Sequence, residues 1–453
     1  MSVRPGFAPA PADELASFLA RHPEVVELDA VVTNLNGALL GKRVPIAEAG
    51  KIFKAGVQFS ASAPLSDVRG MGHDALGIGQ SDGDPDAAGL PVAGTLALAP
   101  WTATPTAQLL CAQTGPDGEP LWFDPRRILA DVVDRCRADG LHPVVALEPE
   151  FYLLDPERDA LGRVQPARAP LTGQRPGTPR NLSVSTVEEF GSVLSALDAA
   201  AKVQGLPLIC VTAEYGLAQF EANLGHGGDP LLAADQAMML RRMVQGVAAA
   251  HGLSATFMAR PFVDQPGNGL HVHVSLVDED GNNRFGADPA LLGHAIGGMQ
   301  ALMYDSVALF APNLNAWRRY DAPFVPQAPL WGENNRSVAF RVPLSPPSGR
   351  RIEHRVAGAD ASPHLVLAAI LAAIHHGVAA RLDPGEPVVG RSTHGRGADF
   401  PSGLLPALDR LERSETLAAY IPVRFLRAYA HVKRGEFASL LSPILDQEYA
   451  YYL

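Results

Sequence analysis

The spacing of hydrophobic and polar positions changes along the chain, and each change predicts a different kind of element. Residues 1–20 begin with a proline-rich segment, after which apolar side chains recur at helical intervals. We therefore expect an amphipathic helix there. Residues 25–44 alternate instead and contain an Asn36-Gly37 turn signal, which predicts two strands joined as a hairpin. The stretch 56–101 is rich in Gly, Asp, Pro and Ser, and we interpret this first part of the chain as a small β-rich domain.

From residue 124 onward, strand and helix patterns alternate. Asp124 is a typical cap for a helix that runs to about residue 138, and Ser185 with Glu188 forms the capping-box pattern of a second helix. Further helices are expected at 231–250, 288–309 and 362–381. Strand patterns lie at 144–154, 207–223, 254–261, 269–277, 336–342 and 350–356. These elements predict an α/β or α+β domain built on one large sheet, with 383–400 as a long surface loop.

Composition narrows the class of protein. The chain has 453 residues, of which 47% are hydrophobic and 19% charged, so it can bury a large core and divide into two or three domains. This excludes a disordered tail and a disulfide-stapled mini-protein. Lys and Arg number 37 against 48 Asp and Glu, and the net charge of −11 disfavours a general nucleic-acid binder.

The cysteines and the apolar runs indicate the compartment. Cys111, Cys136 and Cys210 are too few and too scattered for a disulfide framework or a CxxC metal site, so we expect three buried, small hydrophobic side chains in a reducing compartment. The N-terminus lacks a basic flank followed by an apolar run, and no segment offers about 18 uninterrupted apolar residues. The nearest is 365–380, which contains two histidines. We therefore expect a cytoplasmic protein that binds neither nucleic acid nor membrane.

Carboxylates recur at strand spacing. Glu148 and Glu150 share one face of the apolar strand 144–154, because side chains two residues apart in a strand point the same way. Glu221 lies in the next strand pattern, seven residues after Glu214. Taken singly, such pairs are more often a solvated strand end or an exposed face than a functional site.

A row of histidines shows the same spacing. His271, His273 and Ser275 share one face of the strand 269–277, directly after the flexible sequence Gly267-Asn268-Gly269. Two imidazoles on one strand face are either satisfied core residues or ligands of a metal or substrate. The sequence leaves both interpretations open at this point.

Arginines form the last row. Arg351, Glu353 and Arg355 share one face of the final strand pattern, and Arg336 and Arg341 precede them. On a surface this triplet would be an ordinary salt-bridge ladder worth less than about 1 kcal/mol. Inside a sheet cavity, the guanidiniums could instead bind phosphate or carboxylate through bidentate hydrogen bonds.

Together, these ionisable residues fall on strand patterns that are otherwise apolar. Burying unpaired charges costs on the order of several kcal/mol each, so their convergence would require compensating cations. Five glutamates and one histidine form an oxygen-rich set, which favours Mg²⁺ or Mn²⁺ over zinc. Metal-binding carboxylates opposite arginines indicate phosphoryl transfer from a nucleotide. The chain has no P-loop and no kinase motif, so the nucleotide would bind to an unrelated fold.

In this order, the motifs resemble the glutamine synthetase superfamily across nearly the whole chain, from NLNGALLGKRVP to RIEHRVAGADASPHLV. The resemblance implies an α+β fold, with an N-terminal β-grasp domain over residues 1–112. Over residues 113–453 it implies a glutamine synthetase catalytic domain, in which helices surround a curved antiparallel sheet. It also implies a homo-oligomer, a dodecamer of two stacked hexameric rings with each active site between neighbouring subunits.

The same resemblance implies two to three Mg²⁺ or Mn²⁺ ions per site, with ATP as a substrate. EPEFYLL resembles the paired-glutamate strand of the family. The implied ligands are Glu150, Glu214 and Glu221 for one metal, and Glu148, His271 and Glu353 for the second.

Substrate-binding residues also follow from the resemblance. GNGLHVHVS is similar to the family's GSGMHxHxS segment, which places glutamate on the Gly267 backbone and the nucleotide near His273 and Ser275. The implied arginine roles are glutamate binding for Arg319, Arg336 and Arg355, nucleotide binding for Arg341 and Arg351, and stabilisation of transition-state charge for Arg336 and Arg341. Together with Glu150, Arg336 and Arg341 are the implied catalytic residues.

The amine pocket departs from that of true glutamine synthetases. Where they carry an ammonium-binding aspartate in an FDGSS-like segment, this chain has Ser60, and Asp86 aligns with a second pocket aspartate. The flap after Arg319 reads YDAPFVPQAPLWG and has no glutamate before Glu333. Without the FDGSS aspartate and the flap glutamate, the pocket has room for a larger primary amine. This pattern resembles the γ-glutamylpolyamine (γ-glutamylputrescine) synthetases.

We therefore expect an ATP-dependent ligase that joins the glutamate γ-carboxylate to putrescine, another polyamine or a related alkylamine through a γ-glutamyl phosphate. Three alternatives stay open: a glutamine synthetase that uses ammonium, a catalytically silent structural or regulatory relative, and a carboxylate-pair hydrolase. Trp317 and Trp331 flank the flap and either line an amine channel or pack in the core.

Overall fold

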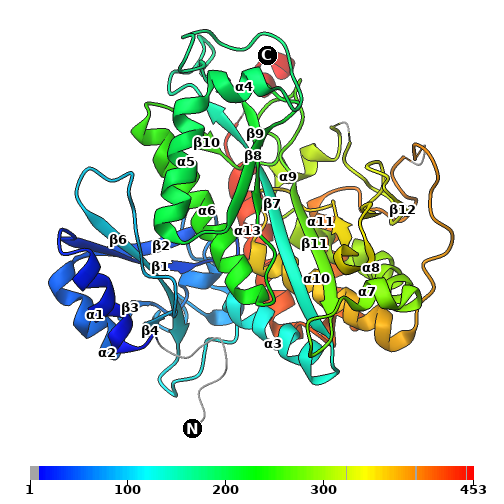
Figure 1. The fold of residues 1–453 in the computed structure, drawn as a ribbon, viewed down its shortest axis with the longest axis horizontal. Helices are drawn as coiled ribbons and strands as arrows, with labels where there is room; N and C mark the ends of the chain where they lie inside the picture. Colours follow the sequence, from blue (N-terminus) through cyan, green and yellow to red (C-terminus); the bar gives the residue numbers. More distant parts are fainter. Residues whose placement is uncertain (1–9, 323, 393–394, 445) are drawn as a thin grey trace.

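The computed structural model describes residues 10–322, 324–392, 395–444 and 446–453, and two sheets organise this part of the chain (Figure 1). The first sheet has the strand order β2-β1-β6-β4-β3, and β5 pairs with β6. Its strands are β1 (Glu27–Thr33), β2 (Leu39–Pro45), β3 (Val57–Ser60), β4 (Asp86–Pro91), β5 (Ala97–Leu98) and β6 (Thr106–Thr114). β1 and β6 run parallel, and the other neighbours run antiparallel.

Two helices accompany this sheet at the blue end of the chain in Figure 1: α1 (Ala12–Arg21) and α2 (Ala49–Ala55). They contact each other, and α2 also contacts β4. This mixed sheet with its helices is consistent with the β-grasp domain that the resemblance implies. Of the helix predicted over 1–20, residues 1–9 lie outside the described range, and the observed helix α1 covers Ala12–Arg21.

The predicted hairpin forms as expected. β1 and β2 pair antiparallel, with Thr33 opposite Leu39. Asn34 Oδ1 accepts hydrogen bonds from the backbone N–H groups of Asn36 and Ala38 and so closes the turn. Gly37 has a φ of +68° and lies against Arg241 of the larger domain, so the turn has no room for a side chain there.

The second sheet has the order β12-β13-β14-β11-β7-β9-β8, and β10 pairs with β7. Its strands are β7 (His142–Leu154), β8 (Leu208–Ala213), β9 (Gln219–Leu224), β10 (Ser254–Thr256), β11 (Leu270–Val277), β12 (Trp331–Glu333), β13 (Phe340–Val342) and β14 (Ile352–His354). All neighbours run antiparallel except β12 and β13. This agrees with the α+β fold and the largely antiparallel sheet that the resemblance implies.

Helices surround the second sheet (Figure 1). They are α3 (Pro125–Ala138), α4 (Val184–Glu189), α5 (Gly191–Gln204), α6 (Pro230–Ala250), α7 (Arg284–Ala287), α8 (Pro289–Phe310), α9 (Leu314–Arg319), α10 (Pro363–Ala380), α11 (Leu404–Arg413), α12 (Glu415–Ala418), α13 (Val423–Leu441) and α14 (Asp446–Tyr452). α6 packs on β7 and β10, and α10 packs on α3, α6 and α8. Asp124 caps α3 by accepting a hydrogen bond from Arg126 N, as predicted.

α10 is long and apolar enough to cross a membrane by length and composition, but 78% of its apolar window is buried inside the protein. It crosses α8 at very short range. A β-carbon on Gly298 would lie 2.0 Å from Ala373 O, and one on Gly377 would lie 2.1 Å from His294 O. α10 is therefore the central core helix of the larger domain.

Three expectations from the sequence are wrong: the position of a helix cap, the continuity of that helix, and the burial of Cys210. The helix cap is Ser183, whose Oγ accepts a hydrogen bond from Thr186 N, and the expected single helix from Ser185 is two helices divided at Phe190. The buried Phe190 ring packs against Phe220, and its non-helical backbone breaks the run. Cys210 is exposed rather than buried, because β8 is an edge strand.

Candidate active site

The predicted rows of polar side chains lie on neighbouring strands of the second sheet, and the strand register aligns them. Glu148 of β7 pairs with His271 of β11, and Glu150 pairs with Glu221 of β9. His273 pairs with Glu353 of β14. Residues from four segments of the chain thus meet on one face, which individual strand patterns could not establish.

One cluster consists of three carboxylates. Ligand oxygens of Glu150, Glu214 and Glu221 all lie within 4.8 Å of one another. Burial raises the pKa of Glu150, and burial together with the Glu150 and Glu221 carboxylates raises that of Glu214 to about 8. Ionised together, these groups repel one another in a poorly solvated site, which a divalent cation would relieve.

A second cluster shares residues with the first. Glu148, Glu221 and His271 form one group of close ligand atoms, and Glu148, His273 and Glu353 form another. The Nδ1 atom of His271 lies 3.4 Å from Glu221 Oε2 and 3.9 Å from Glu353 Oε1. The six expected metal ligands therefore converge, although His273 shares the group of Glu148 and Glu353 in place of His271.

The carboxylate and imidazole donors fit the ions expected from the sequence. Such donors suit Mg²⁺ and Mn²⁺, and no cysteine belongs to these groups in the described part of the chain. The overlapping groups share Glu148 and Glu221, an arrangement in which carboxylates can bridge neighbouring cations.

Arginines surround Glu353. Arg341 Nη1 donates a hydrogen bond of 2.6 Å to Glu353 Oε2, and Arg355 pairs with the other oxygen. Burial opposes ionisation of Glu353, but Arg355, the histidines and Arg341 outweigh it and hold its pKa well below the ordinary value. Arg351 Nε lies 3.1 Å from His273 Nδ1. Three of the predicted arginines thus border the second cluster.

Arg319 links the glycine loop to the first cluster. Its buried guanidinium lies so close to Gly269 that a β-carbon there would be 2.7 Å from Arg319 Nη2. A β-carbon on Gly267 would meet Ala259 O at 2.4 Å, and Gly269 N donates to Glu150 Oε2 at 2.6 Å. Among the described residues, none forms a hydrogen bond with the Nε atom of Arg319. A buried, incompletely paired guanidinium beside open backbone is suited to bind a carboxylate.

Other predicted residues lie farther out. Arg336 is exposed and lines a cavity of about 450 Å³ below the flap, and Ser275 follows His273 on the same strand face. Ser60 and Asp86 are opposite each other across β3 and β4 in the first sheet. Within the described residues, no hydrogen bond or ion pair connects either side chain to the carboxylate clusters.

Some contacts around the site were not foreseen. Asn223 lies two residues after Glu221 on the same strand, and its Nδ2 donates to Glu221 Oε1 at 3.0 Å. Cys210 Sγ contacts the Asn223 side-chain oxygen in turn. Trp317 is buried against Tyr320 and Phe400, which supports the packing interpretation for this residue. Asn223 could have been identified from the sequence, because side chains two residues apart in a strand lie on the same face and Asn223 follows Glu221 at that spacing.

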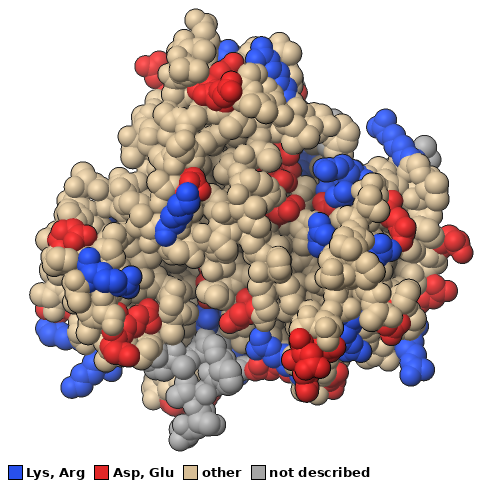
Figure 2. Space-filling view, viewed as in Figure 1, with Lys and Arg blue, Asp and Glu red and all other residues tan. Residues whose placement is uncertain are grey.

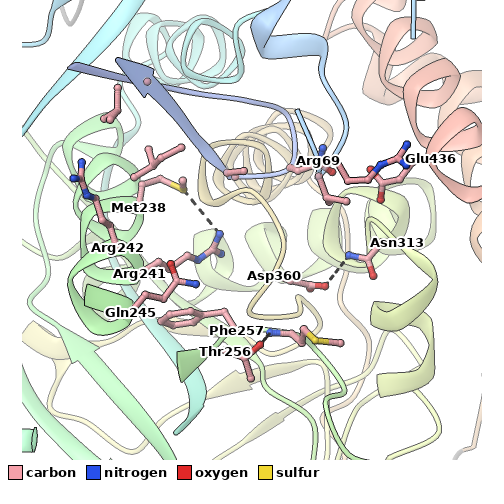
Figure 3. Close-up of a pocket in the computed structure, with 18 of the residues that line it drawn as sticks. Arg69, Met238, Arg241, Arg242, Gln245, Thr256, Phe257, Asn313, Asp360 and Glu436 are labelled. Carbon is pink, nitrogen blue, oxygen red and sulfur yellow. Dashed lines mark hydrogen bonds between the residues drawn. The ribbon is translucent and has the colours of Figure 1, made fainter. Parts of the chain in front are cut away.

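Charged side chains of both signs face each other in a hollow beside the central strands, as Figure 2 shows at the right of its centre. A cavity of about 1030 Å³ lies elsewhere, between β1–β2 and the helices α6 and α13. Figure 3 shows its lining, with the buried Arg241 and the half-buried Asp360 directed into it. None of the predicted site residues lines that cavity, so the convergence of side chains, and not cavity size, locates the candidate active site.

The chain is similar to known proteins along most of its length. Residues 123–452 match the family described as glutamine synthetase, catalytic domain. The chain is 38% identical to the γ-glutamylputrescine synthetase PuuA of Escherichia coli, covering 97% of this chain and 94% of that protein. It is 31% identical to a glutamate–isopropylamine ligase of Pseudomonas, over 83% of each chain. The solved structure of a GmaS–ADP complex superposes with a TM-score of 0.82 at 26% identity, covering 97% of this chain and 99% of that one.

Proposed function

The chain belongs to the glutamine synthetase family, and on that premise we propose that it is an ATP-dependent ligase joining the γ-carboxylate of glutamate to a primary amine. Both relatives named above join glutamate to an organic amine. The observation that carries the proposal is the convergence of five glutamates and His271 beside Arg341 and Arg355. The substrate class proposed is putrescine, another polyamine or a related alkylamine.

Two to three Mg²⁺ or Mn²⁺ ions per site are part of the proposal. The Glu150, Glu214 and Glu221 oxygens would hold one, and Glu148, Glu353 and His271 would hold a second, with His273 close by. When bound, these cations neutralise phosphate charge and polarise phosphoryl oxygens. The raised pKa values of Glu150 and Glu214 support this assignment, because buried like charges need a counterion.

Different residues of the chain would bind glutamate, bind the nucleotide and stabilise charge. Arg319, Arg355 and the Gly267 backbone would hold glutamate, with its γ-carboxylate directed toward the clusters. His273, Ser275 and Arg351 would border the nucleotide. Arg341 would also bind the nucleotide, and Arg336 would also bind glutamate. Both would neutralise charge on the transferred phosphoryl group, where fixed hydrogen-bond donors supply much of the catalysis.

The chemistry balances in two steps. A γ-carboxylate oxygen attacks the terminal phosphorus of ATP and releases ADP, which leaves a γ-glutamyl phosphate. The uncharged amine nitrogen then attacks the acyl carbon, phosphate leaves with the former carboxylate oxygen, and the nitrogen loses a proton. The chain's own residues orient both reactants, and orientation is a large part of the rate in such transfers.

The amine pocket and the assembly complete the proposal. Ser60 and Asp86 would reach the site of a neighbouring copy, because no contact joins them to the clusters of their own chain among the described residues. This requires a homo-oligomer, for which we propose a dodecamer, with a domain boundary near residue 112. A cytoplasmic location is supported by the three unpaired cysteines.

An amine panel tests the function. Phosphate release is measured with ATP, Mg²⁺ and glutamate, and with ammonium, ethanolamine, isopropylamine, putrescine or spermidine as the second substrate. The proposal predicts release that requires both glutamate and an organic amine. Turnover with ammonium alone would instead identify a glutamine synthetase, and absence of any turnover would favour a silent relative.

A further inference from the structure

Two aromatic side chains stack on each other at the edge of the candidate active site. The ring centroids of Tyr215 and Phe324 are 5.3 Å apart, with an angle of 25° between the ring planes. Tyr215 is 46% exposed and Phe324 is 62% exposed. The pair therefore presents apolar ring surface to the space beside the site.

The position of the pair connects the two sides of the site. Tyr215 directly follows Glu214, whose carboxylate belongs to the first cluster. Phe324 lies in the flap five residues after Arg319 and lines the 450 Å³ cavity that also contains Arg336. The stacked pair thus joins the residue next to Glu214 to the cavity that Arg336 lines, where we expect an amine to approach an activated γ-carboxyl group.

The backbone holds Phe324 in an unfavourable conformation. Its φ is +68°, in the left-handed region that a bulky side chain rarely adopts. Such strain persists where the surrounding structure enforces it, and it clusters at ligand clamps and active sites. Here it directs an aromatic ring onto Tyr215 instead of into the core.

We propose that Tyr215 and Phe324 form the subsite for the hydrocarbon chain of the amine, selecting linear primary alkylamines and diamines over ammonium. This rests on the proposed function. The ring faces remove methylene groups from water, at about three- to fivefold in binding for each methylene. They also attract the distal ammonium of a diamine, whereas ammonium itself offers no chain to bury.

The experiment compares four substrates: ammonium, ethylamine, butylamine and putrescine. In the unaltered protein, kcat/KM should rise from ethylamine to butylamine. In Phe324→Leu and Tyr215→Leu, which keep apolar volume but lose a ring, the ratio of kcat/KM for butylamine to that for ammonium should fall about tenfold or more. Tyr215→Phe should retain the chain-length dependence, because it retains the ring.

A matched control is Tyr449→Leu, which removes an exposed aromatic ring from α14 and should leave the butylamine preference unchanged. The inference is overturned if butylamine and ammonium lose rate equally in the ring variants, or if the unaltered protein uses amines without regard to chain length. Size-exclusion chromatography shows whether a ring variant changes the association state of the protein. If it does, and if kcat/KM falls equally for all amines, the rings form a contact between copies, and the inference is overturned. Failure of the unaltered protein to turn over any amine would instead refute the proposed function itself.

Discussion

Glu150 and Glu221 are direct partners across the β7–β9 strand pair, so two carboxylates lie side by side on one face of the sheet. Like charges in this position destabilise a sheet. Glu214 adds a third carboxylate within reach of both. Repulsion among these carboxylates therefore destabilises the folded protein, and bound divalent cations would offset it.

This cost predicts the behaviour of Glu221→Gln. Without divalent cations, the variant should unfold at the same temperature as the unaltered protein or higher, because a like-charge repulsion is removed. At a Mn²⁺ concentration about 100 times the dissociation constant, the unaltered protein should gain about 2.7 kcal/mol, and the variant much less. Thermal unfolding with EDTA and with MnCl₂ measures both effects.

The control for this prediction is Glu279→Gln, an exposed acidic residue in a turn remote from the cluster. It should leave the Mn²⁺-dependent gain unchanged. Equal Mn²⁺ stabilisation in Glu221→Gln and in the unaltered protein would contradict a metal at this cluster.

Asp67 predicts a pH dependence of stability. Its side chain is fully buried, which opposes ionisation, but hydrogen bonds from Met71 N, Arg69 and His73 outweigh this and lower its pKa to about 2. Because the folded-state pKa lies below the ordinary value of 3.8, the ionised carboxylate adds stability above about pH 4. That stability, about 2 kcal/mol, should be lost as the pH falls from about 4 toward 2.

Urea unfolding of the unaltered protein and Asp67→Asn between pH 7 and pH 3 checks this. The difference in unfolding free energy should be largest at pH 7 and should narrow at pH 3. Asp280→Asn, at an exposed turn, is the control and should show a difference that does not depend on pH. A constant gap for Asp67→Asn would show that its charge does not stabilise the fold.

The close crossing of α8 and α10 predicts a contrast between two glycines of the same helix. Gly298→Ala would push a β-carbon to 2.0 Å from Ala373 O and should destabilise the protein by more than about 2 kcal/mol. Gly293→Ala meets only Pro384 at 3.5 Å, and helix propensity should make it neutral or stabilising by up to about 1 kcal/mol. Similar unfolding midpoints for the two variants would contradict this helix packing.

The sequence was informative about the site wherever strand alternation reports which face a side chain occupies. Glu148 and Glu150, like His271 and His273, could be assigned to common faces from their spacing alone. Their pairing across strands could not, because Glu148 meets His271 only through the register of β7 and β11, which are more than a hundred residues apart. The resemblance supplied that convergence in advance.

Other features depend on tertiary position. Cys210 is exposed because β8 lies at a sheet edge, and a strand pattern does not show its place in the sheet. The helix begins at a Ser183 cap instead of at Ser185, and it ends at Phe190, whose ring packs into the core. The stacking of Tyr215 on Phe324 joins a strand end to the flap, and no local pattern predicts such a contact.

Isotope transfer tests the central claim most directly. Glutamate carrying ¹⁸O in both γ-carboxyl oxygens is incubated with the protein, ATP, Mg²⁺ and putrescine, and the products are analysed by mass spectrometry. We predict a γ-glutamyl amide that retains one ¹⁸O and a released phosphate that carries the other. Amide formation with unlabelled phosphate, or consumption of ATP without any amide, would contradict phosphorylation of the γ-carboxylate as the step that activates glutamate.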